Sequence, residues 1–251
     1  MGGSEAPGPY GRRSLYGRSR GKALRSHRAR LIAELLPRVA IDDAALFDPG
    51  RLFPFQLREL RLEIGFGGGE HLAARAREAP DVGFLGCEPF VNGVAKLLAA
   101  IEAEGLANIR IRMGDARALV EALPEASLST IYVLYPDPWP KRRQNKRRLM
   151  SVETIAEFAR VLKPEGELRF ATDIDDYAGW TLSRMLASGA FRWDASRAED
   201  WLEPWAGWSP TRYEAKARAE RRGSAYFSFF RAPSLTLPPA SLQPTAEVAE
   251  L

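Results

Sequence analysis

Apolar residues recur along this chain with two different periods, and segments of the two kinds alternate from residue 59 onward. Short continuous apolar runs predict buried strands, whereas apolar residues three and four positions apart predict helices. Such alternation is typical of an α/β domain with a largely parallel sheet. Residues 190–208 are aromatic and irregular. We expect strands at 60–64, 82–87, 108–113, 129–135, 167–171 and 225–231, and helices at 70–77, 91–103, 152–162 and 177–187.

The remaining segments predict how the chain is divided. Residues 24–37 have the apolar spacing of a further helix, which Pro37 is expected to end because proline lacks an amide donor. Residues 163–166 are expected to separate a helix from the strand that follows. We expect a flexible basic arm at 1–20, a single domain at 21–231 and a disordered Pro-rich tail at 232–251.

Composition narrows the class of protein. Hydrophobic residues make up 45% of 251, which is enough for one domain with a real core. The single cysteine, Cys87, excludes an internal disulfide framework and favours a reducing cytoplasm. No apolar run approaches the length of a membrane span, and the amino terminus lacks an apolar signal core. We therefore expect a soluble cytoplasmic protein without a membrane partner.

Positive charge is concentrated in two segments. Residues 1–30 carry a net charge of +7 and residues 141–148 a charge of +6, so the rest of this +4 chain is at −9. An acidic body with two basic segments indicates an anion-binding face, and nucleic acid is the usual partner of such a face. The basic arm could also meet an acidic membrane surface, but it lacks the apolar face that anchoring requires.

A glycine-rich turn follows the first predicted strand. Gly65, Gly67 and Gly69 permit a tight turn and a close approach of a ligand to the backbone at a helix start. A dinucleotide-binding fingerprint has the spacing Gly-x-Gly-x-x-Gly, but position 70 is Glu. The Glu70 carboxylate would repel a pyrophosphate. Glu63, near the end of the strand, instead suits a cationic amino-acid cofactor such as S-adenosylmethionine.

Two further acids follow the second and third predicted strands. Glu88 stands where a carboxylate accepts hydrogen bonds from ribose hydroxyls, and Asp115 could accept from an adenine amino group. Either acid alone could equally be a helix cap or a solvated charge. Acids at the carboxyl ends of three successive parallel strands, beside the glycine turn, favour S-adenosylmethionine over a nicotinamide dinucleotide.

The loop at residues 135–141 joins a rigid turn to a basic run. Its three prolines fix the backbone and cannot continue a strand, so Asp137 and Trp139 are held on a stiff loop. Six of the eight residues at 141–148 are Lys or Arg, and we expect them to bind phosphates. An acid and a flat ring beside a polyanion site suggest chemistry on a nucleic-acid base. The alternative is a proline turn followed by a solvated basic helix start.

Together these motifs resemble the bacterial tRNA (guanine-N7)-methyltransferase family of class I S-adenosylmethionine-dependent methyltransferases, over residues 16–230. The glycine turn alone indicates only a class I methyltransferase. The Pro-Asp-Pro-Trp-Pro-Lys segment with its trailing basic run is diagnostic of the family. Further matching segments are residues 86–89, 114–116, 171–173 and 211–216.

The resemblance implies a Rossmann-like class I methyltransferase fold, with a seven-stranded, mostly parallel sheet flanked by helices. It implies methylation of N7 of the variable-loop guanine, position 46 of tRNA, by a monomer or homodimer. Asp137 is the implied catalytic residue, and no residue is assigned to a metal. The implied cofactor contacts are Glu63, Gly65, Gly67, Glu88, Asp115 and Asp137, and the implied substrate contacts are Lys141, Asp173, Thr211, Arg212, Tyr213 and Glu214.

Two positions depart from the family pattern. Gln144 replaces a common His, which puts an essential histidine role there in doubt, and Tyr213 replaces a usual Phe. The segment at 211–216 is expected to be a loop that closes over the base.

Guanine N7 carries a lone pair and no proton, so its methylation requires neither a covalent nucleophile nor a general base. We expect Asp137 to orient the guanine and to favour the positive charge that grows on its ring. At an effective dielectric of about 20 and a distance of about 4 Å, one such charge contributes on the order of 4 kcal/mol before desolvation. We expect Trp139 or Tyr135 to stack on an unstacked base, and the alternative for Trp139 is that it holds the loop against the core.

Two other functions stay open at this stage. One is methylation of an exocyclic amine of RNA, because proline-aromatic loops that carry an acid also orient amino nitrogens. The other is tRNA binding without catalysis on a methyltransferase scaffold.

Overall fold

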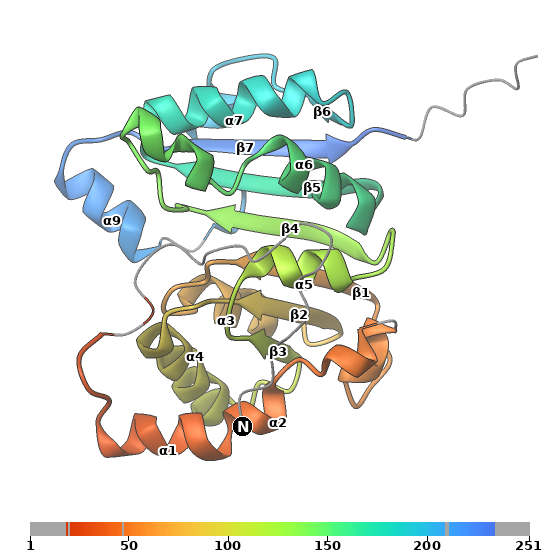
Figure 1. Ribbon diagram of the computed structural model, residues 1–251, viewed down its shortest axis with the longest axis vertical. Coiled ribbons are helices and arrows are strands. Elements are labelled where there is room, and N and C mark those ends of the chain that lie inside the picture. Colours follow the sequence, from red (N-terminus) through yellow and green to blue (C-terminus); the bar gives the residue numbers. More distant parts are fainter. Residues whose placement is uncertain (1–18, 20, 47, 209–210, 234–251) are drawn as a thin grey trace, which may run out of the picture.

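Seven strands form one sheet, in the order β3-β2-β1-β4-β5-β7-β6, within the residues that the computed structural model describes: 19, 21–46, 48–208 and 211–233. β1 to β5 are parallel, β7 runs antiparallel to β5, and β6 runs antiparallel to β7. The predicted seven-stranded, mostly parallel sheet is confirmed (Figure 1). The strands are β1 Glu59–Ile64, β2 Val82–Cys87, β3 Ile109–Arg112, β4 Leu128–Leu134, β5 Leu162–Thr172, β6 Phe191–Trp193 and β7 Ala225–Arg231.

Helices cover both faces of the sheet. The helices after β1 and β2 pack with the amino-terminal helix on one face, around buried Leu31, Leu72 and Leu97. The helices after β3, β4 and β5 pack on the other face, around Leu119, Phe158 and Tyr177. The helices are α1 Ser26–Glu34, α2 Leu36–Val39, α3 Glu70–Glu78, α4 Val91–Glu104, α5 Ala116–Ala122, α6 Val152–Val161, α7 Asp175–Ala187, α8 Glu199–Leu202 and α9 Arg212–Ala219, with short 3-10 turns η1 Asp43–Ala45, η2 Pro49–Leu52 and η3 Arg142–Arg147.

The amino-terminal helix differs from its prediction. α1 ends at Glu34, and Pro37 does not end a helix but lies in the first turn of α2. A proline is tolerated in that turn because the amide it lacks would have no partner within the helix. The predicted arm and tail lie almost wholly outside the described residues, so these two predictions stay untested.

Two further segments were misjudged. Residues 163–166 follow the end of α6 at Val161, as predicted, but they belong to β5, which begins at Leu162 rather than Glu167 and has a φ of 61° at Glu165. The segment at 190–208, predicted to be irregular, contains β6 and α8. α5 was not predicted at all, because its seven residues are too few to show a helical period.

Glycines shape the turn between β1 and α3. Gly65, Gly67 and Gly69 all have positive φ, between 56° and 79°, which other residues rarely adopt. Gly93 in α4 packs so closely on the carbonyl of Gly67 that a Cβ would not fit. The turn is therefore held against the start of α4 and brings its backbone to the carboxyl edge of the sheet.

Within the described part of the chain, no helix has the length and apolarity needed to cross a membrane.

Candidate active site

A cavity of about 400 Å³ lies at the carboxyl ends of the four strands β1 to β4. Residues from each strand-to-helix connection line it, because the carboxyl ends of parallel strands meet at one edge of a sheet. They include Gly65 and Gly67 after β1, Glu88 after β2, Asp115 after β3, and Asp137 and Trp139 after β4. The structure thus brings together the residues that the sequence placed at four separate strand ends.

Glu88 holds the glycine turn in place. Its side chain is buried, and its two carboxylate oxygens accept hydrogen bonds from the amides of Gly67, at 2.7 Å, and Phe90, at 2.9 Å. Burial raises the pKa of Glu88, and the nearby charge of Asp137 adds to this, although the two amides and Arg212 oppose it. A carboxylate has more acceptor positions than these two amides use, so Glu88 can also accept from ligand hydroxyls.

Asp115 has a structural bond as well as a place in the cavity. It caps α5 by accepting from the amide of Arg117 at 3.0 Å, and it forms an ion pair with the Arg117 guanidinium at 2.6 Å. The helix-cap alternative therefore applies, yet Asp115 and Arg117 both line the cavity. The two roles coexist on one side chain.

Glu63 lies behind the cavity rather than in its wall. It is buried on the sheet face covered by α3, and one of its oxygens lies 2.7 Å from Nδ1 of His71. The neighbouring Ile64 points to the opposite face and lines the cavity, because side chains alternate along a strand. The expectation that Glu63 contacts the cofactor stays a prediction.

The loop after β4 has a strained backbone. Tyr135 and Trp139 have positive φ, at 51° and 43°, which is costly for residues with a side chain. The amide of Tyr135 donates to the carbonyl of Ala171 in β5 at 2.7 Å, and its hydroxyl donates to Ser224 at 3.1 Å. These bonds hold the start of the loop against the neighbouring strands and aim Asp137 at the cavity.

Asp137 lies at the mouth of the cavity. Its side chain remains exposed to solvent, but the surrounding protein removes enough water to raise the pKa of its carboxyl above the ordinary value. Arg212 of α9 also lines the cavity, and its positive charge lowers the pKa of Glu88. The cavity therefore combines two carboxylates with raised pKa values, which a cationic ligand would relieve.

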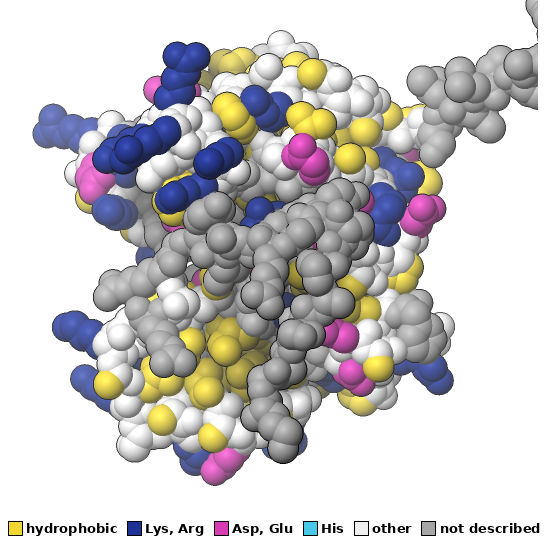
Figure 2. All heavy atoms as spheres, viewed as in Figure 1, with side chains coloured by type: hydrophobic (Ala, Val, Ile, Leu, Met, Phe, Trp, Pro, Cys, Tyr) yellow, Lys and Arg dark blue, Asp and Glu magenta, His cyan; other side chains and the backbone are white. Residues whose placement is uncertain are grey.

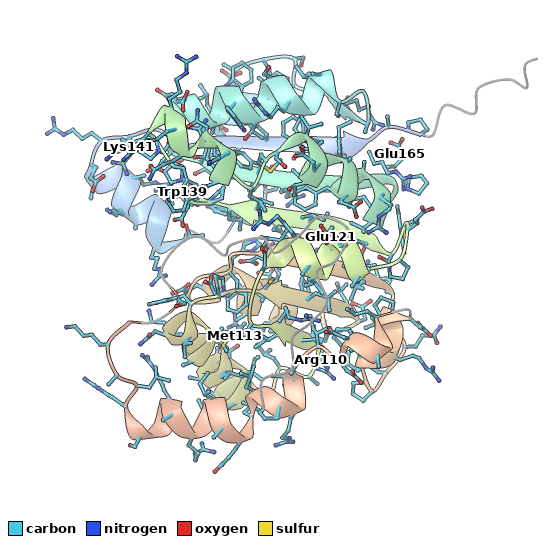
Figure 3. All side chains as sticks on the ribbon, viewed as in Figure 1. Arg110, Met113, Glu121, Trp139, Lys141 and Glu165 are labelled. Atoms are coloured by element: carbon cyan, nitrogen blue, oxygen red, sulfur yellow. The ribbon has the colours of Figure 1, made fainter. Side chains whose placement is uncertain are left out.

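The basic run begins beside this mouth. Lys141, Arg142, Arg143 and Lys146 are exposed, and Figure 3 shows Trp139 and Lys141 next to each other at the same end of the sheet. Arg147 is partly buried, with its guanidinium 4.9 Å from the ring centre of Trp139. Trp139 thus packs under a cation and lines the cavity at once.

Arg148 contradicts the prediction for the basic run. Its side chain is fully buried, so it does not reach a phosphate in this conformation. The cations of the run are exposed from Lys141 to Lys146 and become buried at its end, which its composition alone did not reveal.

Exposed cations of α9 extend the basic surface. Figure 2 shows Lys and Arg side chains gathered at the upper left, over η3 and α9. In α9 these are Arg212, Lys216 and Arg218. The segment at 211–216 is the cap and start of this helix, and the prediction of a loop is wrong.

The remaining predicted substrate residues have structural partners. Thr211 caps α9 by accepting from the amide of Glu214 at 3.2 Å. The Glu214 carboxylate is buried and accepts from Nε1 of Trp208 at 2.5 Å. Asp173, which follows β5, pairs with Arg222 at 2.5 Å. The backbone of Tyr213 lies in α9. Their predicted substrate contacts stay predictions.

Several cavity residues were not assigned from the sequence, among them Phe90 and Arg117. Phe90 directly precedes α4 and Arg117 lies in the first turn of α5, and both line the cavity. Each stands two residues after an acid assigned from the sequence, and that spacing was the available signal. Across the described residues, no group of three or more His, Cys, Asp or Glu side chains is placed to hold a metal.

The strand order and the position of the cavity are those of the class I methyltransferase fold. The 16S rRNA methyltransferase KamB has a TM-score of 0.54, with 19% identity, over 71% of this chain and 90% of that chain. A structure described as an antibiotic-related methyltransferase has a TM-score of 0.50, with 16% identity, over 70% and 89%. At these identities the likeness concerns the fold alone.

Sequence comparison defines the family. A family model described as "Putative methyltransferase" matches residues 58–227. The tRNA (guanine-N(7)-)-methyltransferase of Nitrobacter winogradskyi is 52% identical over 87% of this chain and 86% of that protein. The Rhizobium meliloti protein of the same name is 51% identical over 91% of this chain and 100% of its own length. The chain belongs to the tRNA (guanine-N(7)-)-methyltransferase family, and the resemblance drawn from its motifs is confirmed.

Proposed function

We propose that this protein transfers a methyl group from S-adenosylmethionine to N7 of guanine 46 in the variable loop of tRNA. The observation that carries the proposal is that Asp137 stands between the cavity and the exposed basic run of η3 on one short loop. The same reaction is supported by relatives named tRNA (guanine-N(7)-)-methyltransferase, which share 52% and 51% sequence identity with this chain over most of both proteins.

The cavity residues fit S-adenosylmethionine. Glu88 is placed to accept from ribose hydroxyls, and Asp115 from an adenine amino group, while the backbone of Gly65 and Gly67 admits the amino-acid part closely. Burial raises the pKa values of Glu88 and Asp137, and the positive charge of a nearby sulfonium would favour their ionised forms. When bound, S-adenosylmethionine supplies an electrophilic methyl group.

The residues of this chain need only orient the guanine and stabilise the positive charge that develops on its ring. The N7 lone pair forms the new bond to carbon as the carbon–sulfur bond breaks, and no proton is removed. Positive charge moves onto the guanine ring, so the ionised Asp137 carboxylate favours the product side of the transfer. The carboxylate can also accept from the donors on the Watson–Crick edge of guanine, which would help to orient the base.

The loop also supplies a surface for the base. Trp139 lines the cavity beneath the Arg147 guanidinium, and an unstacked guanine on this ring would gain about 1–3 kcal/mol. Exposed Lys141, Arg142, Arg143 and Lys146 grip phosphates of the same RNA strand. The loop therefore joins base, phosphate and methyl-donor contacts within ten residues.

Methyl transfer from labelled S-adenosylmethionine to unmodified tRNA transcripts tests the proposal. Borohydride reduction and aniline treatment should cleave the product at the variable-loop guanine. Methylation without such cleavage would overturn N7 as the acceptor and favour an exocyclic amine. Tight tRNA binding without any methylation would overturn the enzymatic function and favour a binding role.

A further inference from the structure

Arg148 has contacts unlike those of its neighbours in the basic run. Its side chain has no exposed surface, whereas Arg142, Arg143 and Lys146 are open to solvent. Nε of Arg148 donates to the carbonyl of Pro138 at 2.8 Å. The residue thus connects the end of η3 to the centre of the loop that carries Asp137.

The other contacts of Arg148 lie in α7. Its guanidinium carbon is 4.9 Å from the ring centre of Tyr177 and 4.8 Å from that of Trp180, and the group pairs with Asp176. The rings are fixed in turn: Tyr177 is fully buried, and Nε1 of Trp180 donates to the carbonyl of Met150 at 2.9 Å. Arg148 therefore links the loop to α7 and fixes the position of the loop relative to this packed helix.

Stability alone does not account for a guanidinium at this place. Burying a cation is costly, and an apolar side chain of similar volume in the same position is often neutral or stabilising. Nη1 of Arg148 is buried and makes no hydrogen bond within the described residues. The group is thus incompletely compensated. An apolar residue could reproduce neither its ion pair with Asp176, whose carboxylate is largely exposed, nor its hydrogen bond to the loop.

The bonded carbonyl is well placed to set the direction of Asp137. Pro138 directly follows Asp137, its ring fixes φ, and it has no amide, so the carbonyl is its one backbone hydrogen-bonding group. Because the peptide that follows is planar, holding this carbonyl also holds the amide side of Trp139, whose φ of 43° needs support. The hydrogen bond of Tyr135 to Ala171 holds the other end of the loop.

We propose that Arg148 is a positioning residue that holds Asp137 in its catalytic place through the Pro138 carbonyl, and that it does not bind phosphate. This inference rests on the proposed function, because it assigns Arg148 to the methyl transfer through Asp137. A shift of about 1 Å at a reacting group can cost on the order of 100-fold in rate. Loss of Arg148 should act through such a shift.

A double-mutant cycle with Asp137 tests the proposal. Arg148→Met, which keeps the volume and removes the donor, should lower the single-turnover methylation rate by about 100-fold. In an Asp137→Ala background the same change should lower the residual rate less than about threefold, because residues that act as a unit are not additive. Equal fold losses in both backgrounds would overturn the proposal.

Arg110→Met is the matched control. Arg110 also donates from Nε to a loop carbonyl, that of Leu52 at 2.6 Å, and also lies over an aromatic ring, 4.8 Å from the centre of Phe53. It belongs to β3, at the opposite side of the molecule from Trp139 (Figure 3). Its replacement should leave the single-turnover rate within about twofold, and a loss as large as that of Arg148→Met would overturn the specific role.

Two readouts are independent of activity. Hydrogen exchange at the amides of Asp137, Trp139 and Lys141 should become faster in Arg148→Met and stay unchanged in Arg110→Met. The salt dependence of tRNA binding should stay unchanged in Arg148→Met, and a log–log slope reduced by about 0.7 would assign Arg148 to phosphate and overturn the proposal. If Arg148→Met does not fold, Arg148→Lys replaces it in each of these measurements. That variant keeps the positive charge but lacks the planar guanidinium with its fixed N–H donors.

These outcomes separate the inference from the proposed function. A wild-type protein that does not methylate tRNA would overturn the function, while exchange at the loop would still show whether Arg148 holds it. A methylating wild type with unchanged loop exchange in Arg148→Met would overturn the positioning role alone.

Discussion

Glu88 and Asp137 face one cavity from the ends of β2 and β4, and the charge of Asp137 contributes to holding the pKa of Glu88 above its ordinary value. Burial is the larger cause for Glu88, and it is the cause for Asp137 as well. Two carboxylates whose ionised forms are both disfavoured make a site for a positively charged ligand. The predictions below begin with this pair.

Asp137→Ala should lower the methylation rate at saturating tRNA by at least about 100-fold, because one carboxylate beside the growing ring charge is expected to contribute several kcal/mol. Affinity for S-adenosylhomocysteine, which carries no sulfonium charge, should change less than about threefold, because Glu88 and Asp115 remain. Single-turnover kinetics and calorimetry measure the two quantities. Near-normal methylation by the variant would remove Asp137 from the mechanism.

The pH dependence of the rate follows from the raised pKa of Asp137. The carboxylate is the active form, so the single-turnover rate should rise with pH through a pKa above the ordinary value of 3.8 and then level off. The folded protein holds this proton more tightly than the unfolded chain does. The contribution of Asp137 to stability is therefore present at acid pH and lost as pH rises through the folded pKa.

Asp137→Asn is the control for that profile. It cannot titrate, so the acid limb assigned to Asp137 should disappear from the residual rate, and the variant should be no less stable than wild type at neutral pH. An acid limb that persists unchanged in Asp137→Asn would assign the titration to another group.

Glu88→Gln should weaken S-adenosylhomocysteine binding by about tenfold or more. Both carboxylate oxygens of Glu88 accept from amides, and a glutamine would turn an NH2 group towards one of them. The glycine turn should loosen at Gly67 as a result. Calorimetry measures the affinity, and binding within about twofold of wild type would show that the turn does not depend on this carboxylate.

Removal of exposed cations should weaken tRNA binding and flatten its salt dependence. For Arg142→Ala with Arg143→Ala, the log–log slope should fall by about 1.4 to 1.8 if both contact phosphates. The matched control is Lys163→Ala with Arg192→Ala, which removes two charges near Glu165, at the opposite edge in Figure 3. Equal effects of the two double variants would indicate that tRNA binding depends on the net charge of the protein and not on the exposed cations at 141–146.

The buried pair of Glu63 and His71 should behave as a unit in unfolding. Glu63→Leu alone leaves the His71 ring nitrogen unpaired and should cost about 3 kcal/mol in free energy of unfolding. Adding His71→Phe should recover much of this loss, because the ring packs against Tyr132 and Trp208. Urea unfolding of the wild type, the two single variants and the double variant gives the coupling free energy between the two positions. Strictly additive losses would show that Glu63 and His71 do not act as a unit.

Much of the fold could be predicted because its signals are local. Strand and helix periods from residue 59 onward placed most elements within a few residues, and the acids after β2, β3 and β4 met because parallel strands end at one edge. α5 was missed because it is short, and Pro37 misled because a proline both ends helices and begins them. The first error omits a helix and the second misplaces a helix end, and neither changes the order of the strands.

The amino-acid sequence is enough to predict the alternation of strands and helices, the glycine turn, the acids at the strand ends and the family. What each charged side chain contacts emerges from the folded chain. Glu63 pairs with His71 behind the cavity, and Arg148 lies buried against Tyr177 and Trp180 instead of facing solvent. The physical reason is that periods and turns arise from neighbouring residues. The burial of one charge depends on groups from other elements, which the sequence separates by tens of residues.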